Sequence, residues 1–256
     1  MPTAGGVKAT ARSDALRREE TTVKTGWQLL IEVDEVLQAQ GGDPERIRAR
    51  SSSALTVAER ALELSRSLLH PAVAWRLLPV VGLRHESLLL EEAYRLTGPL
   101  VVEHLQPAKQ VAAVVCTLGP ELEERASALF SEDVAVAMAL DVTGSIALQR
   151  LANAAREQIA LRMGQSGWQV GMALSPGTGW ALETGQRQLF ALVDAGLIGV
   201  QLTASSLMNP KKSTSFVLGA GPDMSSMGSP CDLCDLGETC RYRKLYESEH
   251  GCDVTT

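Results

Sequence analysis

Three of the chain's five cysteines lie close together in the segment SPCDLCDLGETCRYRK, residues 229–244. Cys231, Cys234 and Cys240 have the spacing C-x2-C-x5-C. Two cysteines separated by two residues can bind one ion, because the turn between them brings both sulfurs to adjacent corners of a tetrahedron. Three thiolates suit zinc or an iron–sulfur cluster, since both select soft sulfur ligands. We therefore predict a metal centre here. The alternative is free thiols or a disulfide.

The spacing does not identify the fourth ligand of this centre. Cys252 could complete a four-thiolate site, or the corner could be taken by His250, water or a partner's side chain. Three cations follow the third cysteine directly: Arg241, Arg243 and Lys244. They could offset the negative charge of a thiolate centre or dock an acidic partner, or they could be solvated residues on a short helix.

A second candidate site is the stretch LSPGTGWALETGQRQLF, residues 174–190, in which a strand is expected to end in a Gly-rich turn that leads into a helix. Free backbone N–H groups and the helix dipole suit an anion or a polar ligand tail at such a place. The alternative is that the glycines serve only the tight turn. The candidate binding residues are Ser175, Pro176, Gly177, Thr178, Gly179 and Trp180.

Other reactive side chains give weaker signals. Cys116 ends an apolar run and is expected to be a buried, inert thiol. The four histidines, at positions 70, 85, 104 and 250, show no pairing at metal-ligand spacing. The stretch LTASSLMNPKKSTSF, residues 202–216, is predicted only as a polar loop. No catalytic acid, base or nucleophile stands out, so the sequence leaves open whether the protein is an enzyme.

Composition limits the class of protein. With 256 residues, 45% of them hydrophobic, the chain can bury a core as one large domain or two small ones. Five cysteines are too few for a secreted disulfide scaffold, and the N-terminal residues lack the apolar region of a signal peptide, so a cytoplasmic location is expected. Apolar runs such as VAAVVC are too short to cross a bilayer. A net charge of -6 disfavours binding to nucleic acid.

The first part of the chain is predicted to be helical. We expect residues 1–13 to be disordered and residues 14–72 to form a helical part. Apolar residues recur at helical spacing from Leu16 to Gln40 and again from Leu55 to Leu69. Asp43 followed by Pro44 is typical of a helix start between these two helices.

Residues 73–220 mix helix and strand signals. The alternation in WQVGMAL, residues 168–174, predicts a strand with Trp168, Val170, Met172 and Leu174 on one face. The apolar stripe of the longest helix should pack on a sheet, with Arg150, Asn153, Arg156 and Glu157 outside this stripe. The expected strands are 111–116, 168–174, 198–202 and 213–218, and the expected helices are one after Gly119-Pro120, Asp133 to Met163, and Thr184 to Ala195 with Gly196 as its cap. Residues 221–256 are predicted to be a linker and a cysteine-rich, metal-binding tail.

Four stretches in this order resemble the activation, or reactivation, domain of cobalamin-dependent methionine synthase and its stand-alone homologues. They are VVCTLGPELE, ALDVTGSIALQRLANAA, LSPGTGWALETGQRQLF and IGVQLTASSLMNPKKSTSF, and the resemblance covers about residues 75–220. It implies an α+β fold in which a twisted antiparallel sheet and packed helices form a groove for S-adenosylmethionine. It also implies docking on a cobalamin carrier, where an inactive cob(II)alamin is reduced and methylated.

The sequence departs from this family at two expected ligand contacts. An Arg before the family's Pro-Gly-Tyr turn and the Tyr within that turn correspond here to Ala173 and Thr178. A later strand that carries another contacting Tyr is replaced after Gly221 by the linker and the cysteine segment. The chain is also too short for the catalytic and cobalamin-binding modules of a whole methionine synthase.

Three functions follow from the residues and the resemblance. The leading hypothesis is an accessory protein that supports reductive reactivation of a corrinoid protein, with the cysteine-bound centre relaying an electron. The alternative is a non-catalytic module, stapled by zinc, that binds a corrinoid protein or a methyltransferase. An independent S-adenosylmethionine-dependent methyltransferase is the weakest of the three, because no catalytic residue stands out.

Overall fold

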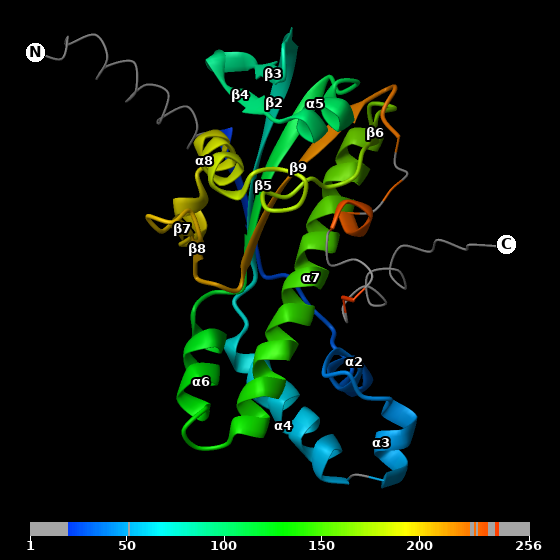
Figure 1. The fold of residues 1–256 in the computed structure, drawn as a ribbon, viewed down its shortest axis with the longest axis vertical. Helices are drawn as coiled ribbons and strands as arrows, with labels where there is room; N and C mark the ends of the chain where they lie inside the picture. The colour runs from blue at the N-terminus through cyan, green and yellow to red at the C-terminus, as the bar shows by residue number, and fades with distance from the viewer. Residues whose placement is uncertain (1–19, 51, 226–227, 229, 235–238, 241–256) are drawn as a thin grey trace, which may run out of the picture.

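The protein is built on one curled antiparallel sheet (Figure 1). The computed structural model describes residues 20–50, 52–225, 228, 230–234 and 239–240. The strand order is β4-β3-β2-β5-β9-β6, and β1 pairs with β2 outside this path. The strands are β1 (Thr22–Thr25), β2 (Ala72–Arg84), β3 (Ser87–Leu90), β4 (Arg95–Thr97), β5 (Gln110–Thr117), β6 (Gln169–Val170) and β9 (Ser213–Gly221). This arrangement confirms the expected α+β fold.

The three central strands are held by long ladders. Eight residue pairs join β2 to β5, from Ala72 opposite Thr117 to Pro79 opposite Gln110, and eight join β5 to β9. Every residue of β5 after Gln110 is buried, because helices cover both faces of the sheet. The apolar, β-branched run in β5 suits such a two-sided burial, and the prediction of a buried strand there is confirmed.

Helices cover the two faces of the sheet and form a cluster at one end. In Figure 1, α7 runs along one face, while α5 and α8 lie on the other. The shorter helices α2, α3, α4 and α6 gather around the first half of α7. The helices are α2 (Val33–Ala39), α3 (Pro44–Arg50), α4 (Ser52–Leu68), α5 (Pro99–Leu105), α6 (Glu121–Leu129), α7 (Val134–Gly164) and α8 (Leu182–Leu192).

The longest helix, α7, belongs to two hydrophobic cores. Its first half, including Leu140 and Ile146, packs with α2, α4 and α6. Its second half, including Leu151 and Ile159, packs on the sheet. The side chain of Asp133 caps the helix by accepting a hydrogen bond from the Val136 amide at 3.2 Å. The predicted helix from Asp133 to Met163 and its packing on a sheet are confirmed.

The composition of α7 has a second consequence. Within the part of the chain that the structure describes, this helix is long and apolar enough to cross a membrane, yet 56% of its most apolar window is buried inside the protein. Polar residues interrupt the apolar ones of α7, so this helix contains no long unbroken apolar run. A helix that is apolar on most sides is expected wherever two cores meet on it.

The predicted helix from Leu16 to Gln40 is wrong between Thr21 and Glu32. Thr22–Thr25 form β1, which pairs with the start of β2, and α2 begins only at Val33. The β-branched residues in Thr21-Thr22-Val23 favour a strand, and Gly26 follows with a φ of +71° that a regular helix does not allow. Two other N-terminal predictions are confirmed: α4 covers the second expected helix, and the Asp43 carboxylate accepts from the Arg46 amide at 3.2 Å. The expected disorder of residues 1–13 lies outside the described residues.

The predicted strand WQVGMAL is regular over only two residues. Val170 pairs with Ala220, whereas Leu174 pairs with Val217, so one extra residue is inserted opposite β9 between these two pairs. This shift reverses the side-chain alternation. Val170 therefore faces the α7 core, while Met172 and Leu174 face the core on the other side.

Two further predictions between residues 184 and 202 need correction. Helix α8 ends at Leu192, where Val193 takes an extended conformation, so Gly196 is not its cap. The expected strand over 198–202 is reduced to β7 (Gln201–Leu202), which pairs with β8 (Met208–Asn209) in a separate two-stranded sheet. A 3-10 turn, η2 (Ala195–Ile198), takes the place of the helix end and the strand start. The division at residues 72 and 220 stays a prediction.

One charged side chain is buried in the sheet. Arg76 on β2 is 1% exposed, and its guanidinium donates to the Glu20 carboxylate at 2.6 Å, to the Glu92 carboxylate at 2.5 Å and to the Leu192 carbonyl at 3.4 Å. Burial alone would lower the pKa of Arg76, but the hydrogen bond and the charge of Glu20, together with Glu92, raise it. The cluster ties residue 20 and the β3–β4 connection to the middle of the sheet.

The Arg76 cluster gives a prediction about stability. The double variant Glu20→Gln/Glu92→Gln leaves a buried cation with neutral partners, and we expect it to lose about 2–4 kcal/mol of unfolding free energy. Arg76→Leu removes the charge as well, and the two carboxylates, 51% and 27% exposed, keep contact with water. It should therefore cost less than the double variant. Urea denaturation measures both, and a larger loss for Arg76→Leu would contradict this account.

Candidate functional site

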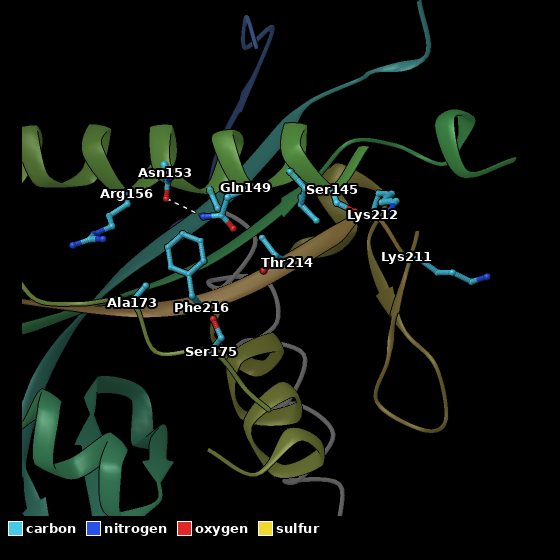
Figure 2. A pocket seen from close by; sticks show the side chains of 12 residues that line it. Ser145, Gln149, Asn153, Arg156, Ala173, Ser175, Lys211, Lys212, Thr214 and Phe216 are labelled. Atoms are coloured by element: carbon cyan, nitrogen blue, oxygen red, sulfur yellow. Dashed lines mark hydrogen bonds between the residues drawn. The ribbon is translucent and has the colours of Figure 1, made fainter. Parts of the chain in front are cut away.

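A pocket of about 230 Å³ lies between α7 and the edge of the sheet (Figure 2). Its size is just below the range of pockets that enclose a whole drug-sized ligand, so it suits part of a larger molecule. Three separate segments line it: α7, the residues that follow β6, and β9 with the loop before it. Helix α7 contributes Ser145, Gln149, Asn153 and Arg156, and the residues after β6 contribute Ala173 and Ser175. Strand β9 and the loop before it contribute Lys211, Lys212, Thr214 and Phe216.

The wall on α7 is a stripe of polar side chains. Ser145, Gln149, Asn153 and Arg156 are spaced by four, four and three residues, which places them on one side of the helix. The Gln149 side-chain amide donates to the Asn153 side-chain oxygen at 3.2 Å, and Asn153 is 8% exposed. Asn153 and Arg156 were expected only off the apolar stripe of α7, and the structure places both in the lining of this pocket.

The wall on β9 follows the alternation of a strand. Thr214 and Phe216 face the pocket, whereas Ser213 and Ser215 point to the opposite side. There the Ser213 hydroxyl donates to the Thr117 hydroxyl, and the Ser215 hydroxyl donates to the Gln186 side-chain oxygen, each at 2.9 Å. These buried bonds fix the register of β9 and hence the position of the two pocket residues.

Lys212 closes one end of the pocket. Its ammonium group lies 2.9 Å from the Asp141 carboxylate and donates to the Ser145 hydroxyl at 2.9 Å. The backbone amides of Lys211 and Lys212 both donate to the Glu123 carboxylate, at 2.7 and 3.1 Å. The stretch predicted only as a polar loop therefore supplies a pocket wall, which the sequence did not indicate because the partners are 67 to 89 residues away.

The turn SPGTGW borders the pocket at Ser175, and its glycines are needed for its shape. Gly177 and Gly179 have φ values of +96° and +65°, and a Cβ on Gly179 would stand 2.5 Å from the side chain of Leu100. The Gly177 amide donates to the Trp180 carbonyl at 2.7 Å, and the Thr178 amide donates to the Ser175 carbonyl at 3.1 Å. These two amides therefore bond within the turn rather than offering free donors to a ligand.

The rest of the turn is fastened to the core. Trp180 is 4% exposed, and its indole N–H donates to the Thr97 carbonyl at 3.0 Å, so its side chain does not line the pocket. A Cβ on Gly185 of α8 would stand 2.9 Å from the Trp180 ring and 3.0 Å from the Pro176 side chain. Of the six predicted binding residues, Ser175 faces the pocket, and Pro176 and Trp180 hold the turn in place.

The chain beyond β9 runs back towards this turn. The terminal methyl of Met224 fits against Gly171 and Gly219, and Met224 is 6% exposed. Further along, Leu233 packs against the core beside Leu100 and Gly179. The segment predicted as a linker is therefore anchored at its start, and the cysteine segment begins beside the turn.

The structure describes only part of the predicted metal centre. Cys234 and Cys240 are free, partly buried thiols; the side chain of Cys231 and all of Cys252 lie outside the described residues. Among the described residues, no three metal-binding side chains come together. Cys116 is fully buried, and burial raises the pKa of its thiol, as expected for an inert cysteine.

The close contact at Gly185 gives a prediction about the turn. Gly→Ala inside a helix usually stabilises by about 1 kcal/mol. In Gly185→Ala, the added methyl must displace the Trp180 ring and Pro176, so we expect a net loss of stability of about 1–2 kcal/mol by thermal unfolding and a shifted Trp fluorescence. Gly164→Ala, at the end of α7 where a Cβ meets nothing, is the control. A stabilised Gly185→Ala would show that the turn is not clamped.

Comparison with known proteins identifies a relative in fold. The chain matches no protein-family model and no curated protein. A crystal structure of the MetH reactivation domain bound to AdoHcy is similar, with a TM-score of 0.54 and 16% sequence identity over 87% of this chain and 86% of that chain. At this identity the likeness concerns the fold alone. The protein has the fold of the MetH reactivation domain over most of its length.

Proposed function

We propose that this protein is an accessory factor of corrinoid-dependent methyl transfer. It binds a ligand of the S-adenosylmethionine class in the pocket between α7 and β9 and supports the reductive reactivation of a corrinoid protein. The observation that carries the proposal is the shared fold with a reactivation domain that binds AdoHcy, with a pocket beside the SPGTGW turn.

The pocket residues suit a ligand that is polar at several points. Gln149, Asn153, Thr214 and Ser175 offer donors and acceptors, and Phe216 offers an apolar surface. The buried bonds at Ser213 and Ser215 hold β9 before the ligand arrives, which lowers the ordering cost of binding. The bound S-adenosylmethionine would supply the methyl group, and the partner protein would hold the cobalamin.

The ligand proposal is tested by equilibrium binding of AdoHcy, measured by calorimetry. We expect the native chain to bind AdoHcy and Ala152→Phe, which fills the pocket, to bind it at least tenfold more weakly. Ala154→Phe, two residues along α7 and outside this pocket, is the matched control. Absence of binding by the native chain would contradict the ligand proposal.

The corrinoid proposal needs a partner. Mixed with a cobalamin carrier, S-adenosylmethionine and a low-potential electron donor, the native chain should convert cob(II)alamin to methylcobalamin, followed by visible absorption. Ala173 and Thr178 replace two contacts expected from the resemblance, which favours the alternative of a non-catalytic module. That alternative predicts carrier binding that is independent of S-adenosylmethionine and no change in the cobalamin. No binding to a carrier would contradict both.

The cysteine segment is the second part of the proposal, as the site of a thiolate-bound metal. Support comes from the spacing of Cys231, Cys234 and Cys240, since a C-x2-C pair can bind one metal ion. The backbone at the start of this segment forms the 3-10 turn η3 (Pro230–Leu233). Leu233 anchors the turn on the core, so a centre here would lie beside the SPGTGW turn.

Metal analysis of protein purified without oxygen tests this centre. We expect either about one equivalent of zinc or iron with sulfide and visible charge-transfer absorption. Zinc would indicate a structural site, and iron with sulfide would indicate a redox centre. Cys234→Ser and Cys240→Ser should each lose most of the metal. Cys116→Ala, which alters the buried thiol in β5, should keep it. A native chain that binds no metal would contradict the proposal.

A further inference from the structure

Lys212 lines the pocket with a cationic side chain, yet the protein itself already binds that cation. Its ammonium group lies 2.9 Å from the Asp141 carboxylate and donates to the Ser145 hydroxyl at 2.9 Å. The Lys212 side chain is 13% exposed, so water does little to weaken these bonds. A negatively charged group of a ligand would have to compete with Asp141 to bind here.

The groups around Lys212 are also in use. The Ser145 hydroxyl, which accepts from Lys212, donates to the Asp141 carbonyl at 3.2 Å. The Lys212 carbonyl accepts from the Leu118 amide at 3.0 Å. Lys211 is exposed, and Figure 2 shows its side chain extending away from the other labelled residues. Bonds within the protein therefore fix this end of the pocket.

Glu123, on α6, holds the same two lysines by their backbone. One oxygen of its carboxylate accepts from the Lys211 amide at 2.7 Å and from the Lys212 amide at 3.1 Å. Hydrogen bonds to an ionised acceptor are stronger than those between neutral groups. Helix α6 packs in the cluster of helices rather than on the sheet, and Glu123 does not line the pocket. Glu123 thus connects the helix cluster to the loop before β9.

Thr214 is the pocket residue that depends on this connection. It follows Lys212 by two residues and is the first residue of β9 that faces the pocket. It lies directly opposite Cys116 of β5 in the sheet. The place where the loop enters β9 decides where the Thr214 hydroxyl lies, and the bonds made by Glu123 and Lys212 fix that place.

We propose that Glu123 and Lys212 are positioning residues of this pocket and that they act through Thr214, whose hydroxyl binds the ligand. The inference rests on the proposed ligand class and adds the residues that hold the pocket in shape for it. A strand that is held before the ligand arrives loses less freedom on binding. Glu123 therefore raises the affinity of the pocket without touching the ligand.

A double-mutant cycle on AdoHcy affinity tests this positioning role. We expect Thr214→Val to bind AdoHcy about 3- to 10-fold more weakly than the native chain, as for the loss of one hydrogen bond. Glu123→Ala and Lys212→Met should weaken binding by a similar factor. When either is combined with Thr214→Val, the affinity should stay within about twofold of Thr214→Val alone. Glu124→Ala, the exposed neighbour on α6, is the matched control and should bind as the native chain does.

The cycle separates positioning from direct contact. A residue that binds the ligand itself would cause its full loss of affinity in the Thr214→Val background as well. A loss of that kind in Lys212→Met would overturn the inference, as would unchanged AdoHcy affinity in Glu123→Ala.

Hydrogen exchange measures the same positioning without a ligand. We expect the amides of residues 211–216 to exchange at least about fivefold faster in Glu123→Ala than in the native chain, with residues 72–78 of β2 unchanged. Equal exchange in the two proteins would contradict the positioning role. Faster exchange together with no AdoHcy binding by the native chain would instead contradict the proposed ligand class.

Discussion

The fold depends on one helix being buried by two different sets of neighbours. Over its 31 residues, about 46 Å, α7 passes from a cluster of helices onto a sheet, and it must offer an apolar surface to each. Small residues allow the other helices to pack closely against the first half of α7. A Cβ on Gly144 would stand 2.6 Å from the side chain of Leu122, so the glycine lets α6 approach. The pocket lies just after the transition between the two cores, where the polar stripe from Ser145 to Arg156 is neither fully covered nor fully exposed.

Elements with their own local signal could be predicted from the sequence. The strand β5, the capped helix α7 and the helix α4 each carry a regular apolar pattern along their own length that no tertiary contact reverses. The errors arise where a distant partner decides. Thr22–Thr25 form a strand because β2 offers a free edge, and the alternation of WQVGMAL is interrupted by an insertion that only the pairing with β9 defines.

The site was only partly predictable for the same reason. The turn SPGTGW has glycines that show its shape, and Ser175 does border the pocket. The remaining wall comes from α7 and from the loop before β9, and nothing local relates Arg156 to Lys212. A polar side chain recurring every three or four residues along one side of α7 was the available signal. It indicates a second, partly polar contact face, but it does not say which other segment forms the opposite wall.

The extra residue between Val170 and Leu174 has a consequence for comparing sequences. Val170 before the insertion and Ala173 after it both face α7. In a regular strand, residues that face the same side are two positions apart, whereas these two are three apart because of the inserted residue. A relative that is one residue shorter here would keep every other side chain on its present face, with an uninterrupted ladder to β9. Sequence alignments of this fold should therefore allow a gap inside this strand, although gaps are usually placed only in loops. Position 173 should be aligned by its distance from the SPGTGW turn that follows it.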